Sequence, residues 1–300
     1  VDHCTRLCHA SSVAAMLETI GSAAVSNQVA DVAKSEVAIV IGARPTENHP
    51  VAATFMKNAA QAGTTLILMD PYRSELARHA RYHLQFRSDT DVPLLNAMMH
   101  TIIKEKLHNS TFIADHTEGF EALETNVSQY PPEKVEPICG IDAETIKTIA
   151  RTYATAKSAM IFWGMGISQH VHGTDNARCL ISLALLCGQI GRPGSGIHPL
   201  RGQNNVQGAS DVGLIPMVYP DYQSVEDIDI RQKFERLWDT KLDPKRGLTV
   251  VEIMQAAHNG NLKGMYIMGE NPAMSDPNLN HAREALSRLC LLYTSPSPRD

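Results

Sequence analysis

The sequence predicts an α/β protein built around a twisted parallel sheet. Three observations support this fold class. Short runs rich in β-branched residues, each bounded by turn residues, recur along the chain. Helical patterns of apolar residues separate these runs. Strands and helices that alternate in this way form βαβ units, in which consecutive strands are parallel and the helices cover the sheet.

The patterns predict four buried parallel strands and six helices. The strands are expected at residues 36–41, 64–69, 158–163 and 263–268. The helices are expected at residues 50–62, 92–107, 143–156, 176–189, 250–258 and 279–286. The strand runs are short and continuously apolar, as in strands that are buried on both faces.

A polar loop with glycine or proline follows each expected strand. The four loops read GARPTENHP, DPYR, GMGISQHVHG and GENPAMSD. Ligands of open α/β sheets bind beyond the carboxyl ends of the strands, where loops offer backbone N–H groups and helix N-termini. We therefore expect the four loops to converge on one edge and to bind a nucleotide-like ligand, although the glycine motifs of NAD and ATP sites do not occur.

Two features of these loops suit a polar ligand. Asp70 ends the second expected strand, where its carboxylate could accept hydrogen bonds from a ribose or a guanine, or could equally cap a helix or an Asx turn. Residues 188–213 form a long glycine-rich segment with Arg, Gln and Asn between the glycines. Such an irregular segment inside a compact domain is usually functional, and these side chains suit ring nitrogens and phosphate.

Composition narrows the class of protein. The 300 residues are 43% hydrophobic with a formal net charge of -5, which fits a globular chain and argues against a broad nucleic-acid surface. The most apolar stretch, residues 179–190, is shorter than the roughly 20 residues of a membrane span. Six irregularly spaced cysteines do not suggest a disulfide framework, so we expect a reducing compartment.

The first residues, VDHCTRLCHASS, place two cysteines four residues apart. One such pair is weak evidence for zinc, because structural zinc sites need a second ligand pair. Cys139, Cys179 and Cys187 have apolar neighbours and are expected to be buried as small hydrophobic side chains. Cys8 is followed directly by His9 at the head of an expected helix. Together they could supply a soft metal ligand and a proton acceptor, although capping and plain burial explain the pair as well.

Seven segments, taken in order, resemble the molybdopterin oxidoreductase superfamily. They are VDHCTRLCHASSVAAM, IGARPTENHP, MDPYRSELARHA, DTDVPLLNAM, WGMGISQHVHGTDNAR, GRPGSGIHPLRGQNNVQGASDVG and YIMGENPAMSDP. The resemblance runs from residue 1 to about residue 289. The Cys-His pair combined with PLRGQNNVQG is most similar to formate dehydrogenase catalytic subunits of the cysteine-containing type. It implies Rossmann-like α/β domains of the formate dehydrogenase/DMSO reductase-like fold.

The resemblance implies a molybdenum or tungsten centre held by two molybdopterin guanine dinucleotides, with Cys8 as the protein ligand to the metal. His9 matches the family histidine that accepts a proton or tunes the metal site. Arg201 matches the family arginine that reaches the metal pocket, and its guanidinium can hold a formate carboxylate through two hydrogen bonds. The implied reaction is the two-electron oxidation of formate to CO2, reversible in principle.

The resemblance also implies contacts to the pterin dinucleotides, mostly from the loops after the expected strands. The matching positions are Arg44, Asn48, Asp70, Asp91, Met165, Gln169, Gln203, Asn271 and Ser275. Two neighbouring residues depart from the family pattern, because Asp89 stands where glycine is frequent and Tyr72 where arginine is common. These departures concern individual contacts and not the cofactor as a whole.

The resemblance divides the chain into an α/β domain over residues 1–201, with the metal-ligand cysteine and one dinucleotide site, and half of a second dinucleotide-binding domain over residues 202–289. Residues 290–300 resemble a translated sequencing adapter. A 4Fe-4S domain upstream and a barrel domain downstream are expected to be missing, which would leave this fragment inactive. Expected partners are formate or CO2 and an electron-transfer subunit, which is either an iron-sulfur subunit or a flavin subunit that reduces NAD. No nucleic acid and no membrane span are expected, and the resemblance favours a cytoplasmic enzyme.

Two alternatives compete with this interpretation. One is another molybdopterin oxidoreductase, such as a nitrate reductase, which in this superfamily lacks the Cys-His pair. The other is a non-catalytic relative, such as the large subunit of respiratory complex I, which keeps the fold without a pterin. The retained Cys8, His9 and Arg201 argue against both.

Overall fold

The computed structural model describes residues 1–295 and divides the chain into two compact units. The larger unit is Cys8–Asn204, and the smaller one joins Val1–Leu7 to Asn205–Asp300. Each unit has hydrophobic clusters of its own. None of the helices over the described residues is long and apolar enough to cross a membrane.

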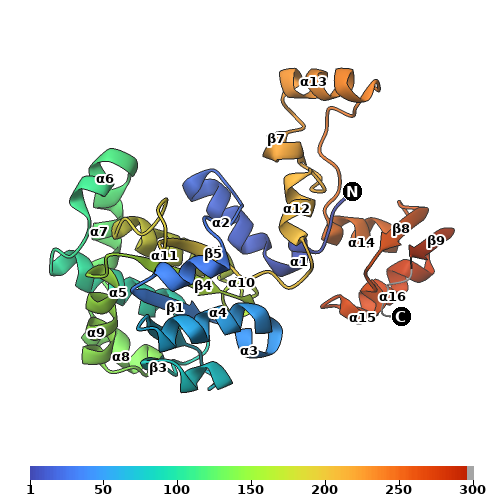
Figure 1. The fold of residues 1–300 in the computed structure, drawn as a ribbon. Helices are drawn as coiled ribbons and strands as arrows, with labels where there is room; N and C mark the ends of the chain where they lie inside the picture. The colour runs from blue at the N-terminus through green and yellow to red at the C-terminus, as the bar shows by residue number, and fades with distance from the viewer. Residues whose placement is uncertain (296–300) are drawn as a thin grey trace. The chain divides into compact units, whose positions relative to one another are not determined.

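A five-stranded parallel sheet forms the centre of the larger unit, with helices around it (Figure 1). Its strands lie in the order β3-β2-β1-β4-β5, and every pairing is parallel. They are β1 (Val37–Ile41), β2 (Thr65–Met69), β3 (Tyr82–Leu84), β4 (Ala159–Trp163) and β5 (Gly196–Pro199). This order is that of a doubly wound, Rossmann-like sheet, so the predicted fold class is confirmed.

Alternate residues of β1 point into two separate cores. Val37, Ile39 and Ile41 belong to one cluster of buried side chains, and Ala38 and Val40 belong to another. Because helices cover both faces, all five positions of β1 are buried. Burial on both faces explains why the strand reads as a continuous apolar run instead of an alternating one.

Helices of the larger unit supply both cores. The first core takes side chains from α2 (Ala10–Ile20), α5 (Asp91–Lys104), α7 (Phe120–Val127), α8 (Pro132–Cys139), α9 (Ala143–Ala154) and α11 (Gly173–Leu186). The second core takes them from α4 (Pro50–Gln61) and the 3-10 helices η1 (Val29–Lys34) and η2 (Glu75–Arg78). The short helices are α1 (Thr5–Cys8), α3 (Pro45–Asn48), α6 (Ser110–His116) and α10 (Met165–Ser168).

The predicted helices of the larger unit are confirmed as α4, α5, α9 and α11, with ends shifted by a few residues. The predicted burial of three cysteines is confirmed as well. Cys139, Cys179 and Cys187 are buried free thiols, and burial raises the pKa of Cys179 and Cys187 to about 12. These cysteines are inert packing residues in the folded chain.

The smaller unit contains short elements around two small cores. They are α12 (Val206–Asp211), β6 (Val218–Tyr219), η3 (Pro220–Tyr222), β7 (Gln223–Ser224), α13 (Ile228–Trp238), α14 (Val250–His258), β8 (Gly264–Met268), α15 (Pro272–Ser275), α16 (Leu279–Ser287) and β9 (Leu291–Ser295). The predicted helices at residues 250–258 and 279–286 are confirmed as α14 and α16. A reciprocal capping box between Thr249 and Glu252 fixes the start of α14.

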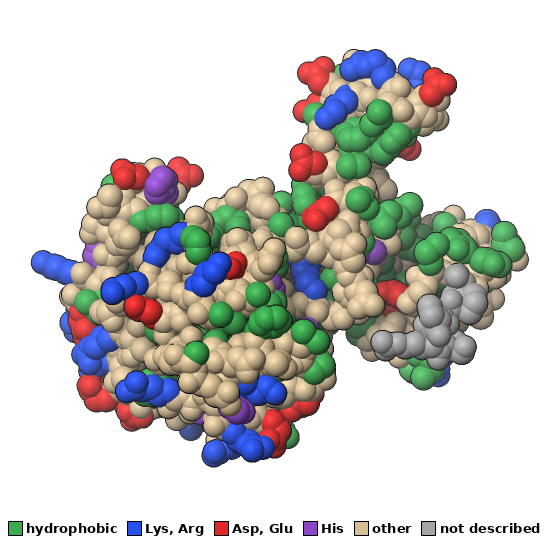
Figure 2. Space-filling view, in the orientation of Figure 1, with side chains coloured by type: hydrophobic (Ala, Val, Ile, Leu, Met, Phe, Trp, Pro, Cys, Tyr) green, Lys and Arg blue, Asp and Glu red, His purple; other side chains and the backbone are tan. Residues whose placement is uncertain are grey.

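The predicted parallel strand at residues 263–268 forms β8, but the predictions that it is buried and that its loop shares one sheet edge with the other three loops were wrong. β8 pairs in parallel with β9 in a separate two-stranded sheet. One face of it, with Met265, packs toward α14 and α16, whereas Tyr266 and Met268 are 57% and 69% exposed. Figure 2 shows hydrophobic side chains on the surface in this region. The loops after β1, β2 and β4 share one edge of the main sheet, and the loop after β8 belongs to a different sheet. The prediction failed because an apolar run does not reveal which strand it will pair with.

Two other predictions concern the glycine-rich segment at residues 188–213 and the segment at residues 290–300. Residues 188–213 are not one irregular segment, because they contain β5 and α12. Several of their glycines adopt a positive φ, as Gly194 does with a φ of 74°. Of the segment that resembles an adapter, residues 291–295 form β9, and residues 296–300 lie outside the described residues.

Candidate active site

The loops after β1 and β4 meet where the order of the strands reverses. β1 pairs with β2 on one side and with β4 on the other, which creates the crevice where such sheets bind ligands. The N–H of Gly166 donates to the carbonyl oxygen of Gly42 at 2.9 Å, and Gly42 has a φ of 55°. A Cβ on Gly166 would lie 2.7 Å from the Cα of Gly42. Glycine at both positions therefore permits the two loops to touch backbone to backbone.

Cys8 is the last residue of α1, and its half-buried thiol lies beside the loop after β4. Its Sγ is 3.6 Å from the Sδ of Met165, the first residue of α10. Burial raises the pKa of the Cys8 thiol, whereas a hydrogen bond with the Gly202 backbone and the positive charge of Arg201 act in the opposite direction. The structure thus brings together Cys8, Met165 and Arg201, three of the predicted site residues.

His9 stands directly before α2, and its side chain is fully buried. Its Nε2 lies 2.8 Å from the carbonyl oxygen of Leu200. Because a carbonyl only accepts, Nε2 carries the hydrogen, and Nδ1 of the neutral ring is an acceptor. Nδ1 lies 3.0 Å from the Oγ of Ser168 and 3.3 Å from the Oγ of Ser12. Burial lowers the pKa of His9 to about 4, so the ring is neutral at physiological pH.

A chain of buried donors leads to His9. The indole Nε1 of Trp163 donates to the Oγ of Ser12 at 2.8 Å, and the hydroxyls of Ser12 and Ser168 are 2.7 Å apart. Donation therefore runs from Trp163 through Ser12 and Ser168 to His9, and from His9 to Leu200. Ser12, Ser168 and Trp163 were not predicted as site residues, because they come from α2, α10 and β4 and no sequence spacing links them.

Arg201 follows β5 and is half-buried. Its Nη2 donates to the carbonyl oxygen of Ala23 at 2.8 Å. Its own carbonyl oxygen accepts from the Nε2 of His49 at 2.9 Å. His49 lies between α3 and α4, and burial lowers its pKa, which keeps the imidazole neutral. His49 belongs to the loop after β1 but was not predicted as a site residue.

Asp70 directly follows β2 and forms an Asx turn. Its Oδ1 accepts from the backbone N–H of Tyr72 at 2.7 Å, so the turn is formed in the structure. Burial raises the pKa of Asp70, and the charge of Arg44 lowers it by less. The guanidinium carbon of Arg44 lies 5.1 Å from the centroid of the Tyr72 ring. Arg44 and Asp70 therefore lie near each other at the carboxyl ends of β1 and β2.

Asp91 begins α5, and its side chain is only 3% exposed. Its Oδ1 is buried without a hydrogen-bond partner among the described residues. Burial raises the pKa of Asp91 to about 6, His170 acts against this rise, and Asp89 and Asp70 add to it. The carboxylate of Asp89, a residue with a φ of 66°, lies 3.5 Å from the Nδ1 of His170.

The remaining predicted contact residues fall into two groups. Asn48, Gln169 and Gln203 are exposed residues of the larger unit, at the end of α3, after α10 and after β5. Asn271 and Ser275 belong to the smaller unit, not to the unit that holds Cys8. There Asn271 stands before α15, and the Oγ of Ser275 donates to the carbonyl oxygen of Asn271 at 3.1 Å.

The donors and acceptors of the larger unit fit a large polar cofactor that brings its own metal ligands. Among residues 1–295 no group of three or more His, Cys, Asp or Glu side chains could hold a metal ion by itself, so Cys8 would be a single protein ligand. A soft thiolate suits a metal bound by sulfur. The buried Oδ1 of Asp91, which has no hydrogen-bond partner in the described part of the chain, suits an N–H or O–H group of a bound dinucleotide.

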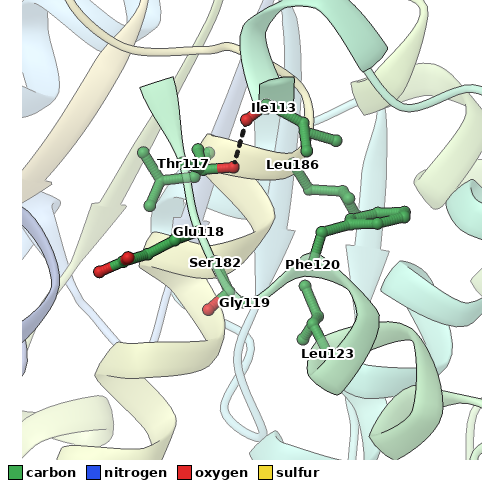
Figure 3. Close-up of a pocket in the computed structure, with 9 residues that line it drawn as sticks. Ile113, Thr117, Glu118, Gly119, Phe120, Leu123, Ser182 and Leu186 are labelled. Atoms are coloured by element: carbon green, nitrogen blue, oxygen red, sulfur yellow. Dashed lines mark hydrogen bonds between the residues drawn. The ribbon is translucent and has the colours of Figure 1, made fainter. Parts of the chain in front are cut away.

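A separate pocket lies among α6, α7 and α11 (Figure 3). It has a volume of about 150 Å³ and a mostly apolar lining that includes Ile113, Phe120, Leu123 and Leu186. No predicted site residue lines it. This pocket is therefore distinct from the crevice beside Cys8.

Comparison with known proteins identifies the family. The family model described as molybdopterin oxidoreductase matches residues 1–294. The chain belongs to the molybdopterin oxidoreductase family, as its sequence motifs predict. The family implies a molybdopterin cofactor, which agrees with the donors and acceptors described above.

Two relatives with similar sequences are a formate dehydrogenase subunit and a formate dehydrogenase. The alpha subunit of F420-dependent formate dehydrogenase from Methanocaldococcus jannaschii is 42% identical over 292 residues, which cover 97% of this chain and 43% of the relative. Formate dehydrogenase H from Escherichia coli is 41% identical over 293 residues, 97% of this chain and 41% of the relative. The chain therefore spans about two fifths of the length of these relatives.

A solved structure shares the fold. Acetylene hydratase from Pelobacter acetylenicus superimposes with a TM-score of 0.70 over 95% of this chain and 41% of that one, at 22% identity. At that identity the likeness concerns the fold alone.

Proposed function

We propose that this chain is part of a formate dehydrogenase catalytic subunit, which oxidises formate to CO2 in a reaction that is reversible in principle. The observation that carries the proposal is the placement of Cys8 at 3.6 Å from Met165, in the loop after β4, beside the neighbouring strand β5 that leads to Arg201. It combines a cation suited to a carboxylate with a soft metal ligand. The identity of about 40% to formate dehydrogenases supports the same substrate.

In the proposed reaction Arg201 binds formate. Its planar guanidinium offers parallel N–H donors to the two carboxylate oxygens, which orients the C–H bond toward the metal site. Cys8 would ligate the metal, and Arg44, Asn48, Asp70, Asp91, Met165, Gln169, Gln203, Asn271 and Ser275 are the proposed contacts to the dinucleotides. A bis-molybdopterin guanine dinucleotide with molybdenum or tungsten, when bound, supplies the two-electron redox chemistry.

The resemblance implies two possible roles for His9, which are to accept the proton or to tune the metal site. The geometry argues against the first role, because both ring nitrogens already have partners inside the protein, and supports a positioning role instead. A neutral ring that donates to Leu200 holds the backbone beside Arg201 in place. His9 would therefore orient the residues that meet formate.

We further propose the setting in which this subunit works. The whole enzyme would carry a 4Fe-4S cluster and pass electrons either to an iron-sulfur subunit or to a flavin subunit that reduces NAD, in the cytoplasm. The cluster, the NAD-reducing partner and the location rest on the sequence resemblance, and the similarity to a formate dehydrogenase alpha subunit supports the presence of further subunits. Cell fractionation and copurification of the whole enzyme would test these assignments.

Formate-dependent dye reduction by the complete, cofactor-loaded subunit tests the activity. The parent enzyme is expected to reduce the dye, and Cys8→Ser is expected to lose activity by at least about a hundredfold together with part of its metal. Cys4→Ser is the matched control, since Cys4 is also a half-buried cysteine on the same segment. A parent enzyme with full metal and pterin content but no formate activity would move the assignment to another oxidoreductase of the family.

A further inference from the structure

Two consecutive backbone carbonyls beside the candidate active site are each held by a histidine. The carbonyl oxygen of Leu200 accepts from the Nε2 of His9 at 2.8 Å, and that of Arg201 accepts from the Nε2 of His49 at 2.9 Å. The guanidinium of Arg201 has an anchor of its own, because Nη2 donates to the carbonyl oxygen of Ala23 at 2.8 Å. Three segments distant in sequence therefore converge on one dipeptide.

His49 is a well-fixed donor. Its backbone N–H donates to the carbonyl oxygen of Pro45, and its own carbonyl oxygen accepts from the N–H of Ala53, both at 2.9 Å. These bonds join the end of α3 to the first turn of α4, so the imidazole projects from a backbone that two helices hold. The carbonyl of Arg201 can only accept, so Nε2 of His49 carries the hydrogen.

The strand before Arg201 is fixed as well. Leu200 donates its N–H to the carbonyl oxygen of Trp163 at 2.8 Å, which extends the pairing of β5 with β4 by one residue. Beyond Leu200 the chain leaves the sheet, and after the half-buried Arg201 residues 202–205 are exposed. Arg201 lies beyond the residues that pair with β4, and the hydrogen bond from His49 to its carbonyl oxygen holds the backbone there instead.

We propose that His49 is a positioning residue for Arg201. By holding the carbonyl of Arg201 while His9 holds that of Leu200, it fixes the direction in which the guanidinium leaves the backbone. The side chain of Arg201 is then ordered before a carboxylate arrives. The entropy cost of ordering it therefore does not reduce the binding free energy of the carboxylate. This inference rests on the proposed function, in which Arg201 binds formate.

Two substitutions of His49 in the cofactor-loaded enzyme distinguish the effect of its N–H donor from the effect of its ring. His49→Gln keeps an N–H group near the place of Nε2, whereas His49→Phe keeps a ring without a donor. We expect His49→Phe to raise the KM for formate about tenfold and to change kcat less than about threefold. His49→Gln is expected to stay within about threefold of the parent KM.

A matched control removes a similar hydrogen bond elsewhere in the unit. The Nδ1 of His100 in α5 pairs with the carbonyl oxygen of Val127 at 3.0 Å. His100→Phe is expected to leave the KM for formate at the parent value. Equal KM values for His49→Phe and His49→Gln would overturn the positioning role, because the donor would then make no difference.

Hydrogen exchange without substrate tests the positioning independently of the reaction. In His49→Phe, peptides that cover residues 197–204 are expected to exchange at least about fivefold faster than in the parent, and peptides from β2 are expected to be unchanged. His49→Gln is expected to restore slow exchange. If His49→Phe does not fold, His49→Ala serves in the same comparison.

The two proposals fail in different ways. Unchanged exchange at residues 197–204 in the variant without a donor would overturn the role of His49, whatever the substrate is. A parent enzyme that turns over no formate would instead overturn the proposed function, and the exchange result would still decide the role of His49.

Discussion

The imidazole of His9 donates its Nε2 hydrogen to the carbonyl oxygen of Leu200 at 2.8 Å. This single bond ties the start of α2 to the end of β5. It also fixes which nitrogen of His9 accepts, so the hydroxyls of Ser12 and Ser168 behind the ring determine how the ring is held. The consequences can be measured in the protein without a substrate.

Ser168→Ala is expected to lower the free energy of unfolding by about 1–3 kcal/mol. The Nδ1 of His9 loses its nearer donor, and the buried hydroxyl of Ser12 loses a partner. Urea unfolding of the variant and the parent measures the difference. Ser128→Ala removes an exposed hydroxyl that donates to the carbonyl oxygen of Thr125 and should cost less than about 0.5 kcal/mol. Equal losses in the two variants would speak against the donor chain.

Asp91→Asn is expected to make the stability of the cofactor-free protein less dependent on pH between about 4 and 6. Burial raises the pKa of Asp91 to about 6, so the folded state keeps a proton that the unfolded state has already lost. As the pH rises through this window the parent loses about 2–3 kcal/mol relative to the variant, since a pKa difference of one unit corresponds to about 1.4 kcal/mol.

Urea unfolding at a series of pH values checks this expectation. Asp115→Asn, a change at an exposed carboxylate, is the control and should follow the parent curve. Parallel curves for the parent and for Asp91→Asn would contradict the burial of an ionisable Asp91.

Gly166→Ala is expected to destabilise the larger unit by about 2–3 kcal/mol. The added Cβ would meet the Cα of Gly42 at 2.7 Å and its carbonyl oxygen at 2.8 Å, and backbone atoms cannot rotate away as a side chain can. Thermal unfolding measures the effect. Gly202→Ala is the control, because its Cβ would meet nothing within 4 Å. If both variants melt with the parent, the backbone contact is looser than described.

Asp89→Gly is expected to be more stable than Asp89→Ala by about 1 kcal/mol. Both changes remove the carboxylate near His170, so the comparison isolates the φ of 66°, which costs a residue with a Cβ more than it costs glycine. Chemical unfolding of the two variants measures the difference. A more stable alanine variant would mean that residue 89 leaves the left-handed region.

Local signals in the sequence predicted most of the main sheet. β1 and β4 read as strands because both of their faces are buried, which gives continuous apolar runs. β5 was missed because its residues, Gly196–Pro199, carry neither alternation nor a β-branched run. The pairing of β8 with β9 could not be predicted either, since tertiary contacts and not the apolar run itself decide which strands pair.

The candidate site divides in the same way. Cys8 and Arg201 stand in motifs that can be read along the chain. His49, Ser168 and Trp163 act through hydrogen bonds to residues more than about a hundred positions away, and such pairs leave no local pattern. Asp70 was open between a ligand contact and an Asx turn, and only the structure shows the turn.

Cys8 and Arg201 lie near opposite ends of the sequence of the larger unit, and Arg201 comes shortly after the last strand of its sheet, which ends at Pro199. During synthesis, Cys8 leaves the ribosome early, and Arg201 emerges only after almost the whole unit has been made. A nascent chain therefore has a cysteine but no pocket around it. The two residues can therefore come together only in the finished unit, after β5 has joined β4.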